Sequence, residues 1–337
     1  MRRRAARRET RFGSVRMTAR HDTPRPSLEE LLPILRAPET RERLRNRDGM
    51  LEAEGGERYL LVDDIPILLG ADDGERIHVR TPESGGLSRL VRWMPSLSRN
   101  VAADENFEVL VSLLERRSSA SGRDQLVLVV GGATEGVGLG ILRARRSIVL
   151  IETDIALGPR TRIVCDVQRL PFADAAFDAV VCQAVLEYVP EPDRAVAEIH
   201  RVLARGGLVY SEIPFLQQAH GPVDFTRYTH VGHRWLYRCF DEVRSGAVGG
   251  PAMALAWAWR AFVVASAGRS TNAQRVASRI AAFTAFWLPS LDNVLARRSA
   301  GLDAAAGTFF LGSRRDDPVD EDVALAAYRG IQHTMWD

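Results

Sequence analysis

The sequence predicts an α/β fold in which a doubly wound, mostly parallel sheet carries helices on both faces. Short apolar runs of strand length recur through residues 125–214, and segments of helical pattern separate several of them. A glycine-rich turn follows the first run, and the next two runs lead into acidic residues. Open sheets of this kind bind ligands beyond the carboxyl ends of their strands, so these turns are the first candidates for a site.

Each of the five runs has the composition of a buried strand. In chain order they cover Leu126–Val130, Ser147–Ile151, Ile163–Cys165, Ala179–Cys182 and Leu208–Pro214. Near-continuous apolar sequence is typical of parallel strands that are covered on both faces. The segment Glu191–Gly207 has a helical pattern and leads into the fifth run. Two further runs, Phe240–Val248 and Thr308–Gly312, indicate a sixth and a seventh strand.

The turn after the first strand is the leading candidate for cofactor binding. Its glycines are Gly131, Gly132, Gly136 and Gly138. Glycine lets backbone approach a ligand closely, although a tight turn without any ligand would explain the same residues. Either Glu152 or Asp154, at the end of the second strand, is placed to hold a ribose hydroxyl.

A series of landmarks then follows in a fixed order. It consists of Leu170-Pro171-Phe172, Phe177-Asp178, Leu186-Glu187-Tyr188, and Glu198 to Arg201-Val202-Leu203 with Gly206-Gly207. Together with the glycine turn, this order resembles the type 11 group of class I S-adenosylmethionine-dependent methyltransferases. The resemblance covers roughly residues 125–315. It implies a seven-stranded, Rossmann-like sheet whose seventh strand runs antiparallel, and S-adenosylmethionine as the cofactor.

The resemblance also assigns roles to individual residues. Asp154 fits the ribose position better than Glu152 does. Asp166 and Val167 are expected to meet the adenine, although Asp166 is also a candidate helix N-cap. Gln183 is expected to face the methionine end of the cofactor. The sequence departs from the family at Val129, where an acid that organises the methionine end is usual.

Residues 27–70 resemble a small Trm112-like module. Ser27, followed by Glu29 and Glu30, indicates a helix start, and the closing motif of that module survives as Tyr59–Val62 and Ile65–Leu68. The cysteine positions of the module are occupied by Ala37 and Thr40. Because a structural zinc needs thiolate or imidazole ligands, we expect a metal-free module that packs on the catalytic domain.

Composition excludes several classes of function. The chain contains no lysine among its 45 basic residues, which excludes Schiff-base chemistry and a P-loop lysine. Residues 1–20 have a net charge of +7 in a chain of net +2, so the body is mildly acidic and a nucleic-acid partner is not expected. The cysteines Cys165, Cys182 and Cys239 are scattered; the first two fall on predicted strands, so we expect core thiols, no metal site and a cytoplasmic protein.

About sixty residues separate the sixth and seventh strands, and they are apolar with a helical pattern. Arg260 lies at the centre of the first apolar run, which is shorter than the about 20 residues that a membrane span needs. Because the sixth strand ends at the ligand edge, we expect the insertion 251–306 over the site mouth as a lid, a pocket wall or a membrane-facing surface. A hairpin against the sheet edge and a dimer contact are alternatives. Its aromatic residues are too many for one helix-pair seam: Trp257, Trp259, Phe262, Phe283, Phe286 and Trp287.

The chain therefore divides into five parts. They are a disordered basic arm (1–26), the small module (27–70), a linker with helices (71–124), the catalytic domain (125–315) and a C-terminal tail (316–337). Helical spacing predicts that the helices before the first strand lie within residues 89–117.

The expected reaction is methyl transfer to a hydroxyl of a small-molecule, glycan or lipid-linked acceptor, with possible peripheral contact at the inner face of a membrane. His220, Asp224 and Tyr228 follow the fifth strand and are the candidate catalytic residues, with His220 as the base and Asp224 orienting its ring. A loop-fixing Asp224–Arg227 ion pair is the structural alternative. A catalytically silent binding protein and a nicotinamide-dependent oxidoreductase are the alternative functions, and the oligomeric state is open.

Overall fold

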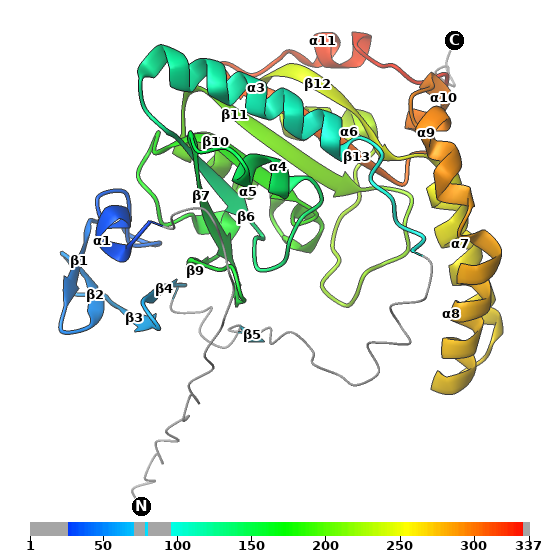
Figure 1. The fold of residues 1–337 in the computed structure, drawn as a ribbon, viewed down its shortest axis with the longest axis horizontal. Coiled ribbons are helices and arrows are strands. Elements are labelled where there is room, and N and C mark those ends of the chain that lie inside the picture. The colour runs from blue at the N-terminus through cyan, green and yellow to red at the C-terminus, as the bar shows by residue number, and fades with distance from the viewer. Residues whose placement is uncertain (1–25, 71–77, 80–95, 333–337) are drawn as a thin grey trace, which may run out of the picture.

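The computed structural model describes residues 26–70, 78–79 and 96–332 (Figure 1). The predicted basic arm lies outside the described residues except for its last residue. Most of the predicted linker and the first part of the predicted 89–117 helix lie outside them as well.

The α/β prediction is confirmed, and the sheet is mixed. Its strand order is β1-β2-β3-β4-β9-β7-β6-β10-β11-β13-β12. Residues 125–314 supply β6 (Gln125–Val130), β7 (Ile148–Asp154), β9 (Ile163–Cys165), β10 (Phe177–Gln183), β11 (Leu203–Pro214), β12 (Phe240–Gly249) and β13 (Gly307–Arg314). All of these run parallel except β13, which pairs antiparallel with both β11 and β12.

The strand count of the sheet is eleven and not seven, because the N-terminal module (residues 27–70) extends it. The module contains α1 (Leu28–Leu31), β1 (Leu44–Arg47), β2 (Met50–Ala53), β3 (Arg58–Val62) and β4 (Ile65–Leu68). The helix start expected at Ser27 is confirmed, and Ser27 and Glu30 form a capping box there. Strand β4 pairs parallel with β9, so the module continues the sheet instead of only packing on it.

Several of the landmark residues hold the fold together. Phe172 forms an antiparallel bridge with Leu35, so the LPF segment is where the module docks. The guanidinium of Arg201 donates to the carbonyl oxygens of Phe172 (2.7 Å) and Leu170 (2.8 Å). Asp178 is buried and accepts two hydrogen bonds from Arg123. These residues therefore have structural roles that explain their spacing.

Helices cover both faces of the sheet, as a doubly wound fold requires (Figure 1). One apolar cluster joins α3 (Ala103–Ser121) and α4 (Leu139–Arg143) to the central strands. A second cluster joins the other face to α5 (Pro192–Val202), α6 (His230–Leu236), the short helix η3 (Leu186–Tyr188) and the N-terminal module. The thiols of Cys165 and Cys182 are buried, as expected, and Cys239 is half-buried.

The insertion forms α7 (Pro251–Ser266) and α8 (Thr271–Ala285), followed by η4 (Leu288–Leu291), α9 (Asp292–Leu295) and α10 (Ser299–Asp303). We call residues 251–285 the hairpin. It projects away from the sheet instead of lying across the ends of β6 and β10 (Figure 1), so it is not a lid over the glycine turn. The buried carboxylate of Asp292 fixes its base, since it accepts from the backbone N–H groups of Gly250, Ala252 and Met253 at 2.8–3.0 Å.

The remaining elements are short. Strand β5 (His78–Val79) pairs with β8 (Ala156–Leu157) beside the end of β7. The tail forms α11 (Glu321–Ala326), which docks on α6 through Arg234. Among the described residues, no helix combines the length and apolarity needed to cross a membrane.

Candidate active site

The carboxyl ends of the parallel strands bring the sequence-predicted cofactor residues to one edge of the sheet. The glycine turn (131–138) follows β6, the acids Glu152 and Asp154 end β7, Asp166 follows β9, and Gln183 ends β10. Because β6, β7, β9 and β10 are parallel neighbours, these residues share one edge, which we call the carboxyl edge. The loop with the candidate catalytic residues follows β11 and starts from this edge too.

The glycine turn is closed by side chains of the chain itself. A Cβ added at Gly131, whose φ is +74°, would lie 2.3 Å from the Val185 side chain. A Cβ at Gly138, whose φ is +89°, would lie 2.3 Å from Phe107 of α3. Positive φ and lack of space both require glycine at these positions. Their presence is thus explained by packing, and a ligand is not needed to account for them.

Asp154 and Glu152 have different surroundings. Asp154 is half-buried, and each of its carboxylate oxygens accepts one backbone hydrogen bond, from Ala133 (3.1 Å) and Ala156 (3.0 Å). Each oxygen retains capacity to accept a second bond. Glu152 is buried and forms an ion pair with Arg143. Asp154 is therefore the better candidate for a ribose hydroxyl.

Asp166 is the N-cap of the short helix η2 (Val167–Arg169), which is the alternative role that the sequence suggested for it. Its Oδ1 accepts from the backbone N–H of Gln168 at 2.8 Å. Both of its oxygens also accept from the Gln168 side chain. Val167 is buried in the core cluster. The cap does not exclude contact with an adenine, but it accounts for the aspartate without one.

Gln183 connects the glycine turn to a polar group that sequence reasoning missed. Its amide nitrogen donates to the Val137 carbonyl at 3.0 Å, and its buried Oε1 has no hydrogen-bond partner within the part of the chain that the structure describes. In register beside it on β11 is Glu212, which accepts from Asn100 (2.8 Å) and from the hydroxyl of Tyr210. Burial raises the pKa of Glu212. The only sequence signal for Glu212 was its place near the end of the fifth strand.

The loop after β11 differs from its predicted arrangement in one respect. Asp224 accepts from the backbone N–H of His220 (2.6 Å) and pairs with Arg227, so it fixes the loop and does not orient the imidazole. The ring instead contacts the Tyr188 hydroxyl at Nδ1 and Gln217 Oε1 at Nε2, both at 3.2 Å. Burial, followed by the charge of Arg227, lowers the pKa of His220. The lower pKa favours the neutral imidazole, in which Nε2 donates to Gln217 Oε1 and Nδ1 accepts from the Tyr188 hydroxyl.

Tyr228 and His220 have different environments. Tyr228 packs against the main core, and burial together with the charge of Asp193 raises the pKa of its hydroxyl. The described hydrogen bonds do not connect Tyr228 to His220, whereas Tyr188 is directly bonded to the His220 ring. In the sequence, Tyr188 is one of the landmark residues and is not a predicted site residue.

Glu187 is the second group that sequence reasoning did not assign to the site. Its side chain is fully buried, and neither carboxylate oxygen has a hydrogen-bond partner among the described residues. Its backbone carbonyl accepts from Phe225 at 2.7 Å, which ties it to the His220 loop. Burial is the main cause that raises its pKa to about 7. A buried, unpaired carboxyl group with such a pKa can accept or donate a proton at neutral pH.

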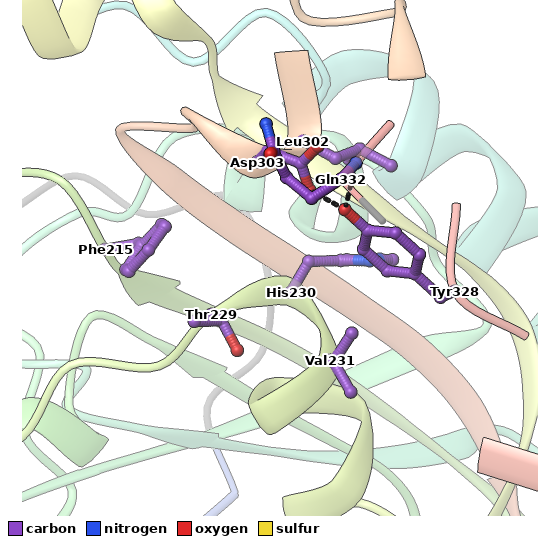
Figure 2. Close-up of a pocket in the computed structure, with 8 residues that line it drawn as sticks. All are labelled: Phe215, Thr229, His230, Val231, Leu302, Asp303, Tyr328 and Gln332. Atoms are coloured by element: carbon purple, nitrogen blue, oxygen red, sulfur yellow. Dashed lines mark hydrogen bonds between the residues drawn. The ribbon is translucent and has the colours of Figure 1, made fainter. Parts of the chain in front are cut away.

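One cavity lies at the base of the same loop, on the side of α6 and the C-terminal tail. It has a volume of about 260 Å³ and is lined by Phe215, Thr229, His230, Val231, Leu302, Asp303, Tyr328 and Gln332. Figure 2 shows the Tyr328 hydroxyl bonded to Asp303 at one side of it. A second cavity of about 290 Å³ lies between β12 and the start of α3. Neither cavity is lined by the glycine turn.

Comparison with protein families gives one match. Residues 146–211 match a family described as a methyltransferase domain. This segment runs from the start of β7 into β11 and contains Asp154, Asp166, Gln183 and Glu187. No curated protein matches the chain.

Solved structures that are similar to this chain include several methyltransferases. The Haemonchus contortus phosphoethanolamine N-methyltransferase 2, in complex with S-adenosyl-L-methionine, is 13% identical with a TM-score of 0.39, covering 58% of this chain and 49% of that one. The chain thus spans about half the length of that enzyme. The Burkholderia thailandensis 1,6-didemethyltoxoflavin-N1-methyltransferase is 14% identical with a TM-score of 0.36, and the alignment covers 71% of this chain and 94% of that one.

A third similar structure is the complex of the Haloferax volcanii Trm112 methyltransferase activator with a methyltransferase. It is 17% identical with a TM-score of 0.37, and the alignment covers 66% of this chain and 100% of that one.

Proposed function

We propose that the chain is an S-adenosylmethionine-dependent methyltransferase that acts on a hydroxyl of a small-molecule, glycan or lipid-linked acceptor. The observation that carries this proposal is the match of residues 146–211 to a methyltransferase domain. The fold supports it, since the matched segment contributes Asp154, Asp166 and Gln183 to the same carboxyl edge as the glycine turn.

The residues present fit the proposed cofactor. The carboxylate of Asp154 has unused acceptor capacity for ribose hydroxyls, and the buried amide oxygen of Gln183, beside the glycine turn, has no partner among the residues described. Glu212 supplies a carboxyl group at the same edge, although β6 carries Val129 where the resembled family has an acid. When bound, S-adenosylmethionine supplies the methyl group on a sulfonium centre.

The chain's own contribution is orientation, exclusion of water and removal of a proton. His220 is the proposed proton acceptor and acts through Tyr188: its Nδ1 accepts from the Tyr188 hydroxyl, which would pass its proton to the ring while it takes one from the hydroxyl of the acceptor. The buried Glu187 lies beside the same loop, where its backbone carbonyl accepts from Phe225. Asp224 and Arg227 keep the loop in place through their ion pair.

Calorimetric titration with S-adenosylmethionine tests the proposal. We expect wild-type protein to bind it and Asp154→Asn to bind about tenfold more weakly, since a charge-assisted hydrogen bond is replaced by a neutral one. Asp241→Asn is the matched control and should bind like wild type, because Asp241 lies at the start of β12, on the sheet edge opposite the carboxyl edge. Transfer of a labelled methyl group into cell extract gives a second readout, in which His220→Ala should be slower by about a hundredfold.

Two results would contradict the proposal. The absence of binding by wild type at millimolar cofactor would favour a catalytically silent protein. A rise in melting temperature with a nicotinamide dinucleotide, but not with S-adenosylhomocysteine, would favour an oxidoreductase.

A further inference from the structure

The hairpin has an inverted distribution of side chains, with small residues inside and large apolar residues outside. The buried positions of α8 are all alanines, and those of α7 are three alanines and Met253. The large side chains that are 40–65% exposed are Leu255, Trp259, Phe262, Val276, Ile280 and Phe283, and Phe286 and Trp287 continue the series. A helix pair that only packed against its own domain would place these residues toward that domain.

Contacts between the two helices show that part of this apolar surface is continuous. The indole N–H of Trp259 on α7 donates to Thr284 Oγ1 on α8 at 2.8 Å. Thr284 lies one turn after Ile280 on α8, and its carbonyl accepts from the indole N–H of Trp287 at 3.1 Å, so Trp259 and Trp287 both bond to Thr284. The rings of Trp259 and Phe262 stack with centroids 6.0 Å apart. We call this surface the hairpin face.

The hairpin face is bordered by positive charge only. Between Pro251 and Leu291 the sequence contains four arginines and no acidic residue. Arg275 and Arg279 are exposed and lie on α8 next to Val276 and Ile280, about 100° around the helix from them. Arg269 is exposed at the turn between the helices, whereas Arg260 is half-buried and bonded to Ser278.

We propose that the hairpin docks on the surface of a bilayer that contains anionic lipids. Aromatic and aliphatic residues on one side, with arginines at its border, are the composition of helices that lie in a membrane interface. The indole rings of Trp259 and Trp287 suit the headgroup level, where tryptophan is enriched. The sixteen residues of α7 make the hairpin about 24 Å long, and it projects away from the sheet (Figure 1).

Charge favours this occupant over a second copy of the chain. A two-fold contact through the hairpin face would bring the arginines of both copies together, and the hairpin offers no carboxylate to pair with them. Anionic headgroups supply the complementary charge, and each arginine near such a surface strengthens binding about fivefold. The proposal is independent of methyl transfer, because it rests on residues outside the carboxyl edge.

Vesicle flotation of the full chain tests the proposal. We expect binding to vesicles made of equal parts phosphatidylcholine and phosphatidylglycerol, and little binding to pure phosphatidylcholine. Phe262→Ser with Phe283→Ser should weaken binding more than tenfold, because both rings are exposed and would enter the interface. Arg275→Gln with Arg279→Gln should weaken it about 30-fold at low salt.

Controls distinguish loss of the surface from loss of the fold. Leu60→Ser with Arg205→Gln changes equally exposed residues elsewhere and should leave binding unchanged. The circular dichroism of the hairpin variants should match that of wild type. Equal binding to both kinds of vesicle, unchanged binding of the hairpin variants, or a dimer that Phe262→Ser and Phe283→Ser convert to monomer without any vesicle binding would each overturn the proposal.

Discussion

The N-terminal module and the hairpin are both additions to the same sheet, but they place their apolar side chains in opposite ways. In the module, Leu35, Leu51 and Leu68 are fully buried in the main core cluster, and β4 pairs with β9. In the hairpin, the buried residues are alanines and Met253, Trp257 is half-buried, and most of the other large side chains face outward. Apolar composition alone therefore does not tell a stabilising addition from a docking surface, because what matters is which residues the neighbouring element covers.

The largest expected effect is a difference in stability loss between two phenylalanine variants, one where the module docks and one in the hairpin. Phe172→Ala should lower the free energy of unfolding by about 3–5 kcal/mol, because the ring is fully buried where the module docks. Phe283→Ala should lower it by less than about 0.5 kcal/mol, since the ring is 60% exposed. Urea unfolding of both variants measures the difference, and similar losses would show that the hairpin face is covered.

A smaller effect is expected at the base of the hairpin. Asp292→Ala removes the acceptor of three backbone N–H groups at the start of α7, at a cost of about 2–3 kcal/mol. Hydrogen exchange of the α7 amides should become faster, while that of α3 should not change. Asp292→Asn keeps one acceptor oxygen and should have an intermediate effect. Unchanged exchange in α7 would mean that Asp292 does not fix the hairpin.

The smallest expected effect is a pH dependence of stability, and it arises at His230 on α6, outside the hairpin. Burial lowers the pKa of His230 to about 4, whereas in the unfolded chain the histidine binds a proton below about pH 6.5. The unfolded state therefore binds more protons between these values, and this contribution to stability is lost as the pH falls through the window. Between pH 7 and pH 5, the free energy of unfolding of His230→Gln should therefore fall by about 1–2 kcal/mol less than that of wild type.

Glu187 provides the opposite control, because its raised pKa makes the folded state bind more protons in this range. Glu187→Gln should therefore lose more stability than wild type as the pH falls toward 5. The hairpin has no titratable side chains other than arginine between residues 251 and 291, so its vesicle binding should not depend on its own protonation in this range. If the free energy of unfolding depends on pH in the same way in wild type and His230→Gln, the lowered pKa of His230 is contradicted.

The sequence by itself determined the local structure and the sheet of residues 125–314. Apolar runs located seven strands of residues 125–314 but not the short β8, and Ser27 with the following glutamates marked the start of α1, because strand period and helix capping act over a few residues. Parallel order then placed the glycine turn, Asp154, Asp166 and Gln183 at one edge. Their contact with a cofactor stays a prediction.

Only the tertiary structure decided how distant segments meet. The junction of β4 with β9 joins residues about a hundred positions apart, and no local pattern encodes that register. The pairing of His220 with Tyr188, and the unpaired carboxyl group of Glu187, likewise depend on where the loop after β11 folds back. The direction of the hairpin depends on Asp292, some forty residues after the start of α7. Burial and long-range contacts arise from the packing of the whole chain, so the residues that they govern could not be assigned from spacing alone.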